Sequence, residues 1–325
     1  MPAPTYRTIY LLCPANVRTG GPEALHQLGR ALRDLGHDAR MVYVSRDAEP
    51  VVTPGVLRFA PIADPMPDAY APYDLPHTFE IRDDAANALV FSEMWPRILR
   101  SVSRLAPYMW WLSIDNGLNA VRDFGGFDAI RSARCQHLCQ SYYALSYLLA
   151  RNIPGLALFD YTASEHLAAA GTSQTPRIDR VLYPARGRWF TGWLRRWAPD
   201  LPWQEIAGFT PDQVRELFLT SKLYVDFGSH PGKDRMPREA AILGCCVITG
   251  QRGAAGNPFD VPLLARYKFK DSRLRIPEIA RAIRTVMAGY DHCVGDFATY
   301  RRTIEGERLE FNAQVARVFG GRTNP

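Results

Sequence analysis

The chain has 325 residues, of which 47% are hydrophobic and 22% are charged, and its formal net charge is +6. These values describe a folded globular protein of about two domains and exclude a disordered or fibrous chain. The positive charge suits an anionic ligand, an anionic membrane face or nucleic acid, and by itself it does not select one of them.

Cysteines and the N-terminus bear on the compartment. The six cysteines fall mostly within apolar runs and show no paired spacing of metal ligands, so we expect them to be reduced, buried and structural. The first residues have no signal pattern, and no apolar run reaches the roughly 18 residues of a spanning helix. We therefore expect a cytoplasmic protein, at most attached peripherally to the inner face of the membrane.

The first predicted elements form one unit of a parallel α/β domain. A buried strand at Thr8–Cys13 is followed by a loop with Gly20 and Gly21, a helix that begins near Pro22, and a second strand at Ala39–Val44. Glycine allows a ligand to approach the backbone closely, which makes Gly20 and Gly21 candidate donor contacts. A simple connecting turn is the alternative.

The rest of the first half continues the alternation after an interruption. Residues 50–76 are rich in proline and lack periodicity, which predicts an irregular excursion. Strands are then predicted at Ala88–Phe91, Tyr108–Ser113, Gln136–Gln140 and Leu156–Phe159, and helices at Trp95–Arg104 and Tyr142–Arg151.

The second half begins after a polar stretch, Ala170–Arg177, which is the best linker candidate. Strands are predicted at Ile178–Tyr183, Pro202–Ile206, Leu223–Phe227, Cys245–Thr249 and Arg266–Phe269. Helices are predicted at Trp189–Trp197, Pro211–Thr220, Met236–Gly244 and Pro277–Gly289, the second with a capping box of Thr210 and Gln213. A helical tail, Asp296–Phe319, completes the chain. We expect domains at 1–172 and 173–300, with 301–325 crossing back to the first domain.

The loop between the strands at Leu223–Phe227 and Cys245–Thr249 has the strongest functional pattern. Ligands of open α/β sheets bind beyond the carboxyl ends of the strands, where a helix N-terminus attracts anions. Lys233, Arg235 and Arg238 lie beside such an end and indicate phosphate binding, while Glu239 is placed to accept hydrogen bonds from sugar hydroxyls.

Three further segments are weighed against structural roles. Arg186 follows the first strand of the second half and is suited to bind a diphosphate, with solvated surface arginine as the alternative. Asp115 follows a buried strand and is a candidate general base on an acceptor hydroxyl, with a cap on the next turn as the alternative; Glu93 is a weaker candidate of the same kind. The segment Trp189–Trp197 mixes aromatic residues and arginines as interfacial helices do, although a helix packed on the core is the preferred interpretation.

Taken together, these segments resemble the large retaining class of GT-B glycosyltransferases that use nucleotide sugars, the family 4-like class, over most of the chain. The Gly20–Gly21 entry is similar to the family's acceptor and donor loop, and Arg186 stands where the family has a phosphate-binding lysine. Glu239 matches the second glutamate of the family's Glu-x7-Glu motif, which holds the donor ribose. Pro231 stands where the first glutamate is expected, so Asp234 or His230 replaces it or donor-sugar recognition differs.

The turn at Gly253 and Ala254 resembles the family's turn after the motif. The resemblance implies two doubly wound Rossmann-like domains facing each other across a cleft. It also implies a glycosyltransferase that takes a nucleoside-diphosphate sugar and a glycan or lipid-linked acceptor, with retention expected over inversion. His230, Asp234 and Asp115 are its expected catalytic residues.

No metal, no further cofactor and no nucleic-acid partner are expected, because the sequence has no zinc pattern, Walker loop or RNA-binding aromatic motif. Two alternatives stay open. One is a nucleotide-sugar 2-epimerase of the same architecture, and the other is a non-catalytic GT-B module that binds nucleotide sugar or scaffolds glycan assembly.

Overall fold

The structure is a computed structural model that describes residues 6–172 and 176–320. They form two compact units: unit 1 contains the chain up to Asp160 and again from Leu309 on, and unit 2 contains Tyr161–Arg308. The sequence instead suggested boundaries after residues 172 and 300. Residues 173–175 of the predicted linker lie outside the described residues.

Unit 1 is built on a seven-stranded parallel sheet of order β10-β9-β8-β7-β1-β2-β5. The strands are β1 (Thr8–Pro14), β2 (Asp38–Val44), β5 (His77–Thr78), β7 (Asn87–Ser92), β8 (Ala106–Trp111), β9 (Gln136–Cys139) and β10 (Leu156–Ala157). The central strands β1 and β7 are buried along almost their whole length, as in sheets covered on both faces.

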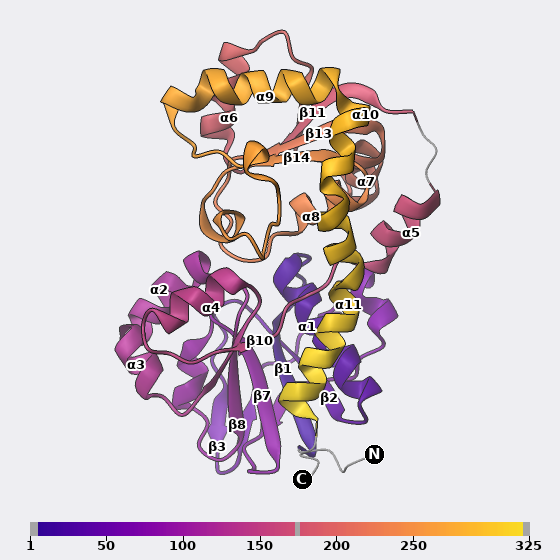
Figure 1. The fold of residues 1–325 in the computed structure, drawn as a ribbon. Coiled ribbons are helices and arrows are strands. Elements are labelled where there is room, and N and C mark those ends of the chain that lie inside the picture. The colour runs from indigo at the N-terminus through magenta and orange to yellow at the C-terminus, as the bar shows by residue number, and fades with distance from the viewer. Residues whose placement is uncertain (1–5, 173–175, 321–325) are drawn as a thin grey trace, which may run out of the picture. The chain divides into compact units, whose positions relative to one another are not determined.

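Helices cover both faces of this sheet. They are α1 (Gly20–Asp34), α2 (Ile114–Phe124), α3 (Gly126–Ser132) and α4 (Tyr142–Leu149). Because crossovers between parallel strands are right-handed, connections that run in opposite directions along a sheet cover opposite faces. Figure 1 shows α1 on one side of the strands and α2, α3 and α4 on the other. The direction reverses between β1 and β7, which makes their carboxyl ends the switch point of unit 1.

The predicted irregular excursion at residues 50–76 is only partly irregular. It contains β3 (Val51–Thr53) and β4 (Val56–Arg58), which pair as a hairpin, and then the short helix η1 (Asp68–Tyr73). The later strand β6 (Glu80–Arg82) pairs with β4 and completes a three-stranded sheet. Pro54 and Gly55 form the hairpin turn, and Gly55 has a φ of +76°. This Pro-Gly pair is a turn signal that the density of prolines concealed.

Unit 2 is built on a four-stranded parallel sheet of order β12-β11-β13-β14. Its strands are β11 (Ile178–Pro184), β12 (Trp203–Ile206), β13 (Ser221–Asp226) and β14 (Cys246–Thr249). Its helices are α5 (Ser164–Thr172), α6 (Arg188–Trp197), α7 (Pro211–Thr220), α8 (Arg235–Ile242), α9 (Ile276–Ala288) and α10 (Tyr290–Cys293), with short turns η3 (Gly253–Gly256), η4 (Ala265–Tyr267), η5 (Arg273–Arg275) and η6 (Val294–Phe297). The direction reverses between β11 and β13, so this unit has its own switch point.

Most predicted elements are present, and the capping box of Thr210 and Gln213 on α7 is confirmed by reciprocal hydrogen bonds of 2.9 and 3.3 Å. Two predictions were wrong. The helix predicted at Trp95–Arg104 is only the short η2 (Pro96–Arg100), because Asp83 accepts the backbone N–H groups of residues 103–105 and directs the chain into β8.

The strand predicted at Arg266–Phe269 is η4 instead. Lys268 forms a single isolated β-bridge with Thr249 at the end of β14, so this segment does not add a further strand to the sheet. Four α-helices of the described residues were not predicted, namely α2, α3, α5 and α10.

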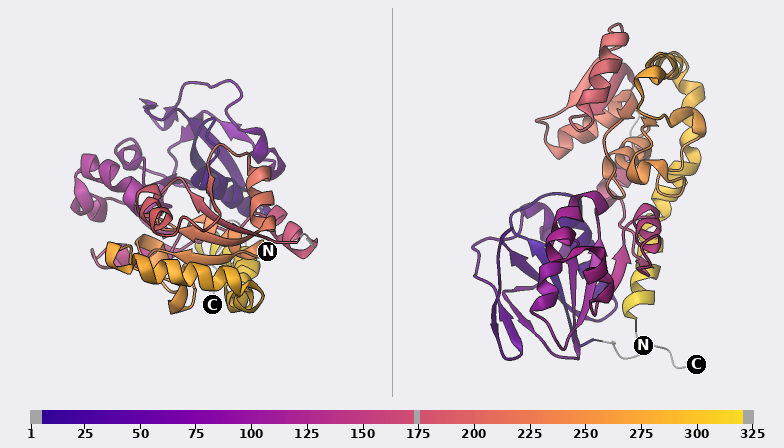
Figure 2. Two further views of the ribbon diagram at one scale, coloured as in Figure 1. Left: turned by 90° about the horizontal axis from the view of Figure 1, so that it is seen from above. Right: turned by 90° about the vertical axis from the view of Figure 1, so that its left-hand side faces the viewer.

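The helix α11 (Ala298–Phe319) contributes to both units and appears as one continuous helix in Figure 2. Its residues through Arg308 belong to unit 2 and its later residues to unit 1. In unit 1, the Gln314 side chain accepts a 2.7 Å hydrogen bond from the backbone N–H of Phe159, and the Phe319 ring packs against Tyr108.

Candidate functional site

The switch point of unit 2 carries a buried network of charges. Arg186 follows β11 and Asp226 ends β13, so the carboxyl ends of these neighbouring strands bring them together. One guanidinium nitrogen of Arg186 lies 2.6 Å from Asp226, and the other terminal nitrogen lies 2.8 Å from Asp234. The two carboxylates therefore fix the orientation of the guanidinium, while the Arg186 side chain as a whole is 31% exposed.

Glycine is required where the two switch-point loops meet. Gly187 has a φ of +72°, and a Cβ atom there would lie 2.5 Å from the backbone nitrogen of Gly228. A Cβ on Gly228 would lie 2.8 Å from the Arg186 side chain. The loops therefore pack backbone on backbone, which fixes the root of Arg186.

Asp226 and His230 form the buried floor of this network. Asp226 is fully buried and also accepts hydrogen bonds from the Tyr224 hydroxyl at 2.8 Å and the Gly228 N–H at 2.9 Å. The His230 ring is 0% exposed, with Nδ1 2.6 Å from Asp234 and Nε2 3.6 Å from Asp226. His230 thus joins the two acids that hold Arg186.

The charges of this network support one another. Burial by itself raises the pKa of Asp234, but the hydrogen bond from His230 and the charge of Arg186 outweigh it, so its pKa lies below the usual value. For Arg186 burial acts to lower the pKa, and the charges of Asp226 and Asp234 raise it well above normal. Arg186 and Asp234 are therefore both ionised at neutral pH.

A second buried network occupies the other side of the predicted phosphate loop. Glu307 of α11 lies 2.9 Å from the Lys233 ammonium and 3.0 Å from Arg238, and it accepts hydrogen bonds from Thr162. Burial acts to raise the pKa of Glu307, but the charges of Arg238 and Lys233 lower it overall. Arg238 is buried and the Lys233 side chain is 9% exposed, and because both pair with Glu307 they hold the loop to α11.

Sequence reasoning missed Glu307, although a signal was present. The buried apolar residues Tyr300, Ile304, Phe311 and Val315 lie in one stripe of the helix, and Glu307 fills the gap of seven residues between Ile304 and Phe311. An acid in an apolar stripe is almost always paired. The position of Glu307 therefore predicts that it pairs with a buried cation. The pattern does not identify that cation, because Arg238 lies 69 residues earlier in the chain.

The remaining predicted donor residues surround α8. Arg235 is the first residue of α8, and Glu239, one turn later, has a carboxyl oxygen 3.7 Å from His166 of α5. The turn after β14 is attached to the same loop, because Ala254 donates a 2.8 Å hydrogen bond to the carbonyl of His230. A Cβ on Gly253 would collide with that carbonyl. Unit 2 thus places all the predicted residues of the second half on one edge of its sheet.

The predicted residues of the first half lie in unit 1. Gly20 and Gly21 begin α1 directly after the loop that follows β1. Asp115 is in the first turn of α2 and accepts a 3.1 Å hydrogen bond from the Tyr143 hydroxyl. Asp115 is therefore part of a helix rather than a cap on a turn. Burial, together with the charge of Asp115, raises the pKa of Tyr143 to about 12, so this hydroxyl keeps its proton.

Glu93 lies at the switch point of unit 1. It follows β7, is almost completely buried, and accepts a 2.8 Å hydrogen bond from the backbone N–H of Leu112. A Cβ on Gly117 of α2 would collide with the Glu93 side chain. Burial raises the pKa of Glu93 to about 8, so it is largely protonated at neutral pH.

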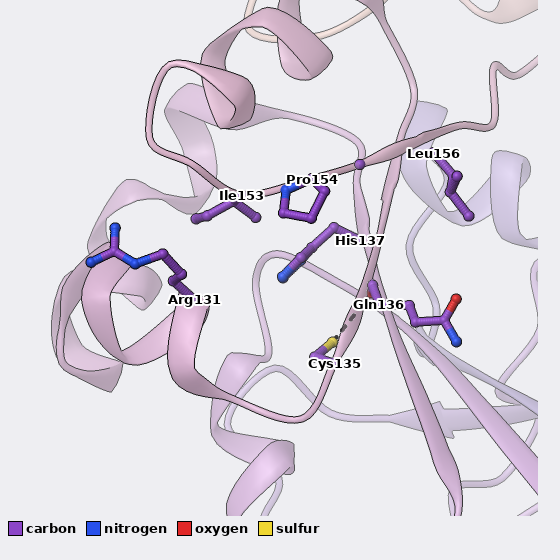
Figure 3. Close-up of a pocket in the computed structure, with 8 residues that line it drawn as sticks. Arg131, Cys135, Gln136, His137, Ile153, Pro154 and Leu156 are labelled. Carbon is purple, nitrogen blue, oxygen red and sulfur yellow. Dashed lines mark hydrogen bonds between the residues drawn. The ribbon is translucent and has the colours of Figure 1, made fainter.

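A cavity of about 290 Å³ lies at the opposite edge of this sheet, at the amino ends of β9 and β10 (Figure 3). His137 lines it, and burial lowers its pKa to about 4, so the ring is neutral. Its Nδ1 accepts a 3.1 Å hydrogen bond from the Trp111 indole. The cavity is thus remote from the carboxyl edge where ligands of such sheets bind.

Two searches of the described part of the chain gave negative results. Within residues 6–172 and 176–320, no three or more His, Cys, Asp or Glu side chains are arranged to hold a metal ion. Among the helices of these residues, none is both long enough and apolar enough to cross a membrane.

Two doubly wound α/β units, each with a switch point, define the GT-B fold, and the predicted fold class is confirmed by solved structures. No family model and no curated protein matches the sequence.

Among the solved structures that resemble the chain is Anabaena HepE in complex with UDP-glucose, with 10% identity, a TM-score of 0.61, and coverage of 96% of this chain and 98% of that one. Another is sucrose-phosphate synthase from Thermosynechococcus elongatus, with 12% identity, a TM-score of 0.60 and coverage of 96% and 98%. A third, trehalose-6-phosphate from E. coli bound with UDP-2-fluoro glucose, has 10% identity, a TM-score of 0.61 and the same coverage.

Proposed function

We propose that this protein is a metal-independent glycosyltransferase that moves a sugar from a nucleoside-diphosphate sugar to a glycan or lipid-linked acceptor in the synthesis of surface polysaccharide or glycoconjugate. One observation carries the proposal: Arg186, whose guanidinium is fixed by two carboxylates and whose side chain is partly exposed, lies at the switch point of the second unit of a GT-B fold. Structures of this fold include proteins solved with UDP and with UDP-glucose, which supports a nucleotide sugar as the ligand.

On the donor side, Arg186 binds the diphosphate and stabilises the negative charge that develops on the leaving group. Arg235, at the N-terminus of α8, adds a second cation and the positive end of a helix dipole. Glu239 accepts hydrogen bonds from the ribose hydroxyls, and the Gly253–Ala254 turn lets the nucleotide approach the backbone.

The buried members of the network act through Arg186. His230 has no exposed surface, so we assign it and Asp234 to positioning the guanidinium rather than to contact with the sugar. Lys233, already paired with Glu307, contributes positive potential to the phosphate site and keeps the loop in place.

On the acceptor side, Asp115 orients or deprotonates the acceptor hydroxyl, and Gly20 and Gly21 let the donor approach the start of α1. We propose transfer with retention of configuration. The required charges come from arginine side chains and a helix dipole, so no metal ion takes part.

A second candidate, a GT-B module that binds nucleotide sugar without transferring it, is favoured by one observation. Pro231 stands eight residues before Glu239, where the resembling family has a glutamate that contacts the donor sugar. A pyrrolidine ring offers no acceptor for a sugar hydroxyl.

The test is calorimetry of the full chain against UDP, GDP and ADP and their glucose conjugates. Arg186→Ala should abolish measurable binding. Arg188→Ala should not, because Arg188, the first residue of α6, is exposed and is paired with Glu205 of β12. Glu239→Gln should weaken binding of the nucleotides about tenfold, the effect of losing a charge-assisted hydrogen bond. Circular dichroism of each variant confirms that it is folded.

Each result then decides between the candidates. If none of the nucleotides or nucleotide sugars binds, the proposal is wrong. If a nucleotide sugar binds and is neither transferred nor hydrolysed with acceptors present, the binding module is correct. Release of an epimerised sugar without an acceptor identifies an epimerase.

A further inference from the structure

Helix α6 of unit 2 has one more apolar stripe than packing requires. Phe190 and Leu194 are buried against the core of the unit. Beside them run Trp189, Trp193 and Trp197 at intervals of four residues, and Trp189 and Trp197 are 63% and 57% exposed. One apolar stripe is enough to anchor a surface helix, so the tryptophans are available for contact with something outside the unit.

Arginines surround these indoles. Arg273 of η5 lies 4.3 Å from the ring centre of Trp193 and 5.5 Å from that of Trp189, and Arg196 lies 5.5 Å from Trp193. In the described part of the chain, no ion pair involves Arg195, Arg196 or Arg273. These three charges are therefore not neutralised by carboxylates, and the cation–π contacts hold two of them over the indoles.

The acids of the segment that follows α6, Asp200 and Glu205, do not cancel this charge. Glu205 is paired with Arg188 and Asp200 with Arg284, so each acid is matched by a further arginine. Leu274 follows Arg273 and is 92% exposed. A hollow of about 820 Å³, lined by Trp189, Trp193 and neighbouring residues of α6, lies on the same face.

We propose that this face docks unit 2 onto an anionic lipid bilayer. The α6 surface is defined by Trp189, Arg195, Arg196, Trp197, Arg273 and Leu274. Indole rings occupy the headgroup level of a bilayer, arginines pair with lipid phosphates, and an exposed leucine enters the acyl boundary.

The chemistry favours a bilayer over a soluble polyanion. Single-stranded nucleic acid is also held by arginines and stacked aromatic rings, but it gives no partner to an almost fully exposed leucine. The α6 surface combines that leucine with uncompensated positive charge, which matches an anionic interface with an apolar layer beneath it. This inference goes beyond the proposed transferase activity, because it concerns binding in the absence of any nucleotide sugar.

The experiment is sedimentation of the full chain with vesicles of phosphatidylcholine alone or mixed with phosphatidylglycerol, without donor or acceptor. Binding to the mixed vesicles alone is expected, accompanied by a blue shift of tryptophan fluorescence. Neutralising two arginines, in Arg195→Gln/Arg196→Gln, should weaken binding about thirtyfold, since each arginine near an anionic surface contributes about 1 kcal/mol.

Apolar contact is tested separately. Leu274→Ser and Trp189→Ala/Trp197→Ala should each weaken binding at least threefold, whereas the matched control Leu309→Ser, an exposed leucine of unit 1, should not. Leu274 is so exposed that its replacement does not threaten folding. Circular dichroism checks the double tryptophan variant.

Three results would overturn the inference: equal binding to both kinds of vesicle, unchanged binding of the Leu274→Ser and double tryptophan variants, or binding to dextran sulfate or single-stranded DNA without binding to vesicles. None of these results bears on nucleotide binding, so the transferase proposal is judged independently by calorimetry.

Discussion

At the switch point of unit 2, Arg186 lies between the carboxylates of Asp226 and Asp234, whereas at the switch point of unit 1 the buried carboxyl of Glu93 is held by a backbone amide. Opposite charges keep the pKa of Asp234 low, although its burial alone would raise it. Burial in unit 1 raises the pKa of Glu93 to about 8. A doubly wound sheet thus carries a charged network at the switch point of one unit and a neutral carboxyl at that of the other.

The largest effect is expected where a buried charge loses its partner. Arg186→Met leaves Asp226 buried without its cation, so the free energy of unfolding should fall by about 3 kcal/mol. The double variant Arg186→Met/Asp226→Asn removes both charges and should recover at least half of that loss. Denaturant unfolding measures both. If the double variant instead loses as much unfolding free energy as Arg186→Met and Asp226→Asn lose together when made singly, the ion pair is not what stabilises this site.

A nearly equal effect should follow from filling the space between the two loops. Gly187→Ala places a methyl group against the backbone of Gly228 at a positive φ, and should cost about 3 kcal/mol of unfolding free energy. Gly208→Ala is the matched control, because Gly208 has a φ of +76° but open space around it; its expected cost is about 1 kcal/mol. Equal melting temperatures of the two variants would argue against the close approach.

Glu93 should make the stability of the protein depend on pH in the opposite sense to a paired acid. Its folded-state pKa of about 8 lies above the normal value of 4.5, so the folded chain holds a proton that the unfolded chain releases between these pH values. As the pH rises from about 5 to 8, the unfolding free energy of the wild type should therefore fall by about 3.5 kcal/mol more than that of Glu93→Gln.

The control for this experiment is Glu305→Gln, an exposed acid of α11 whose replacement should leave the pH dependence unchanged. Parallel unfolding curves of wild type and Glu93→Gln across this pH range would mean that Glu93 is ionised in the folded protein. The contrast between the two switch points would then be lost.

The smallest change in stability is expected at Asp115. Its hydrogen bond with Tyr143 is at the surface, so Asp115→Asn should change the unfolding free energy by less than about 1 kcal/mol. Donor affinity by calorimetry should stay within twofold, while transfer to an acceptor falls sharply. A loss of donor affinity comparable to that of Arg186→Ala would place Asp115 on the donor side and remove the division of roles between the units.

Local patterns in the sequence were sufficient for most of the fold. Apolar runs predicted the central strands, and the capping box predicted the start of α7, because both depend on neighbouring residues. The helix α2 was missed because the sequence Asp115-Asn116-Gly117 is typical of a turn. The helix η2 was predicted too long because its end depends on Asp83, which binds the backbone after η2 but lies outside the local apolar pattern.

The sequence predicted that the candidate residues of the second half lie close together, but it did not predict their pairings. The Gly/Pro-rich loop and Arg186 were identified as parts of a phosphate site, and the structure places them on one edge of unit 2. The partners were not predictable, because Asp226 and Glu307 read as a strand residue and a helix residue in a single sequence. Asp226 and Glu307 are far along the chain from Arg186 and Lys233, so these ion pairs form only when the unit is folded.

The division of α11 between the units has a consequence for synthesis on the ribosome. Unit 2 is a continuous segment, Tyr161–Arg308, and all of it has been made before the residues from Leu309 on are added. Unit 1 begins first but lacks Gln314 and Phe319, with their contacts to Phe159 and Tyr108, until those residues are added. The unit whose synthesis begins first is therefore completed after the other, because the whole sequence of unit 2 has been added before Leu309.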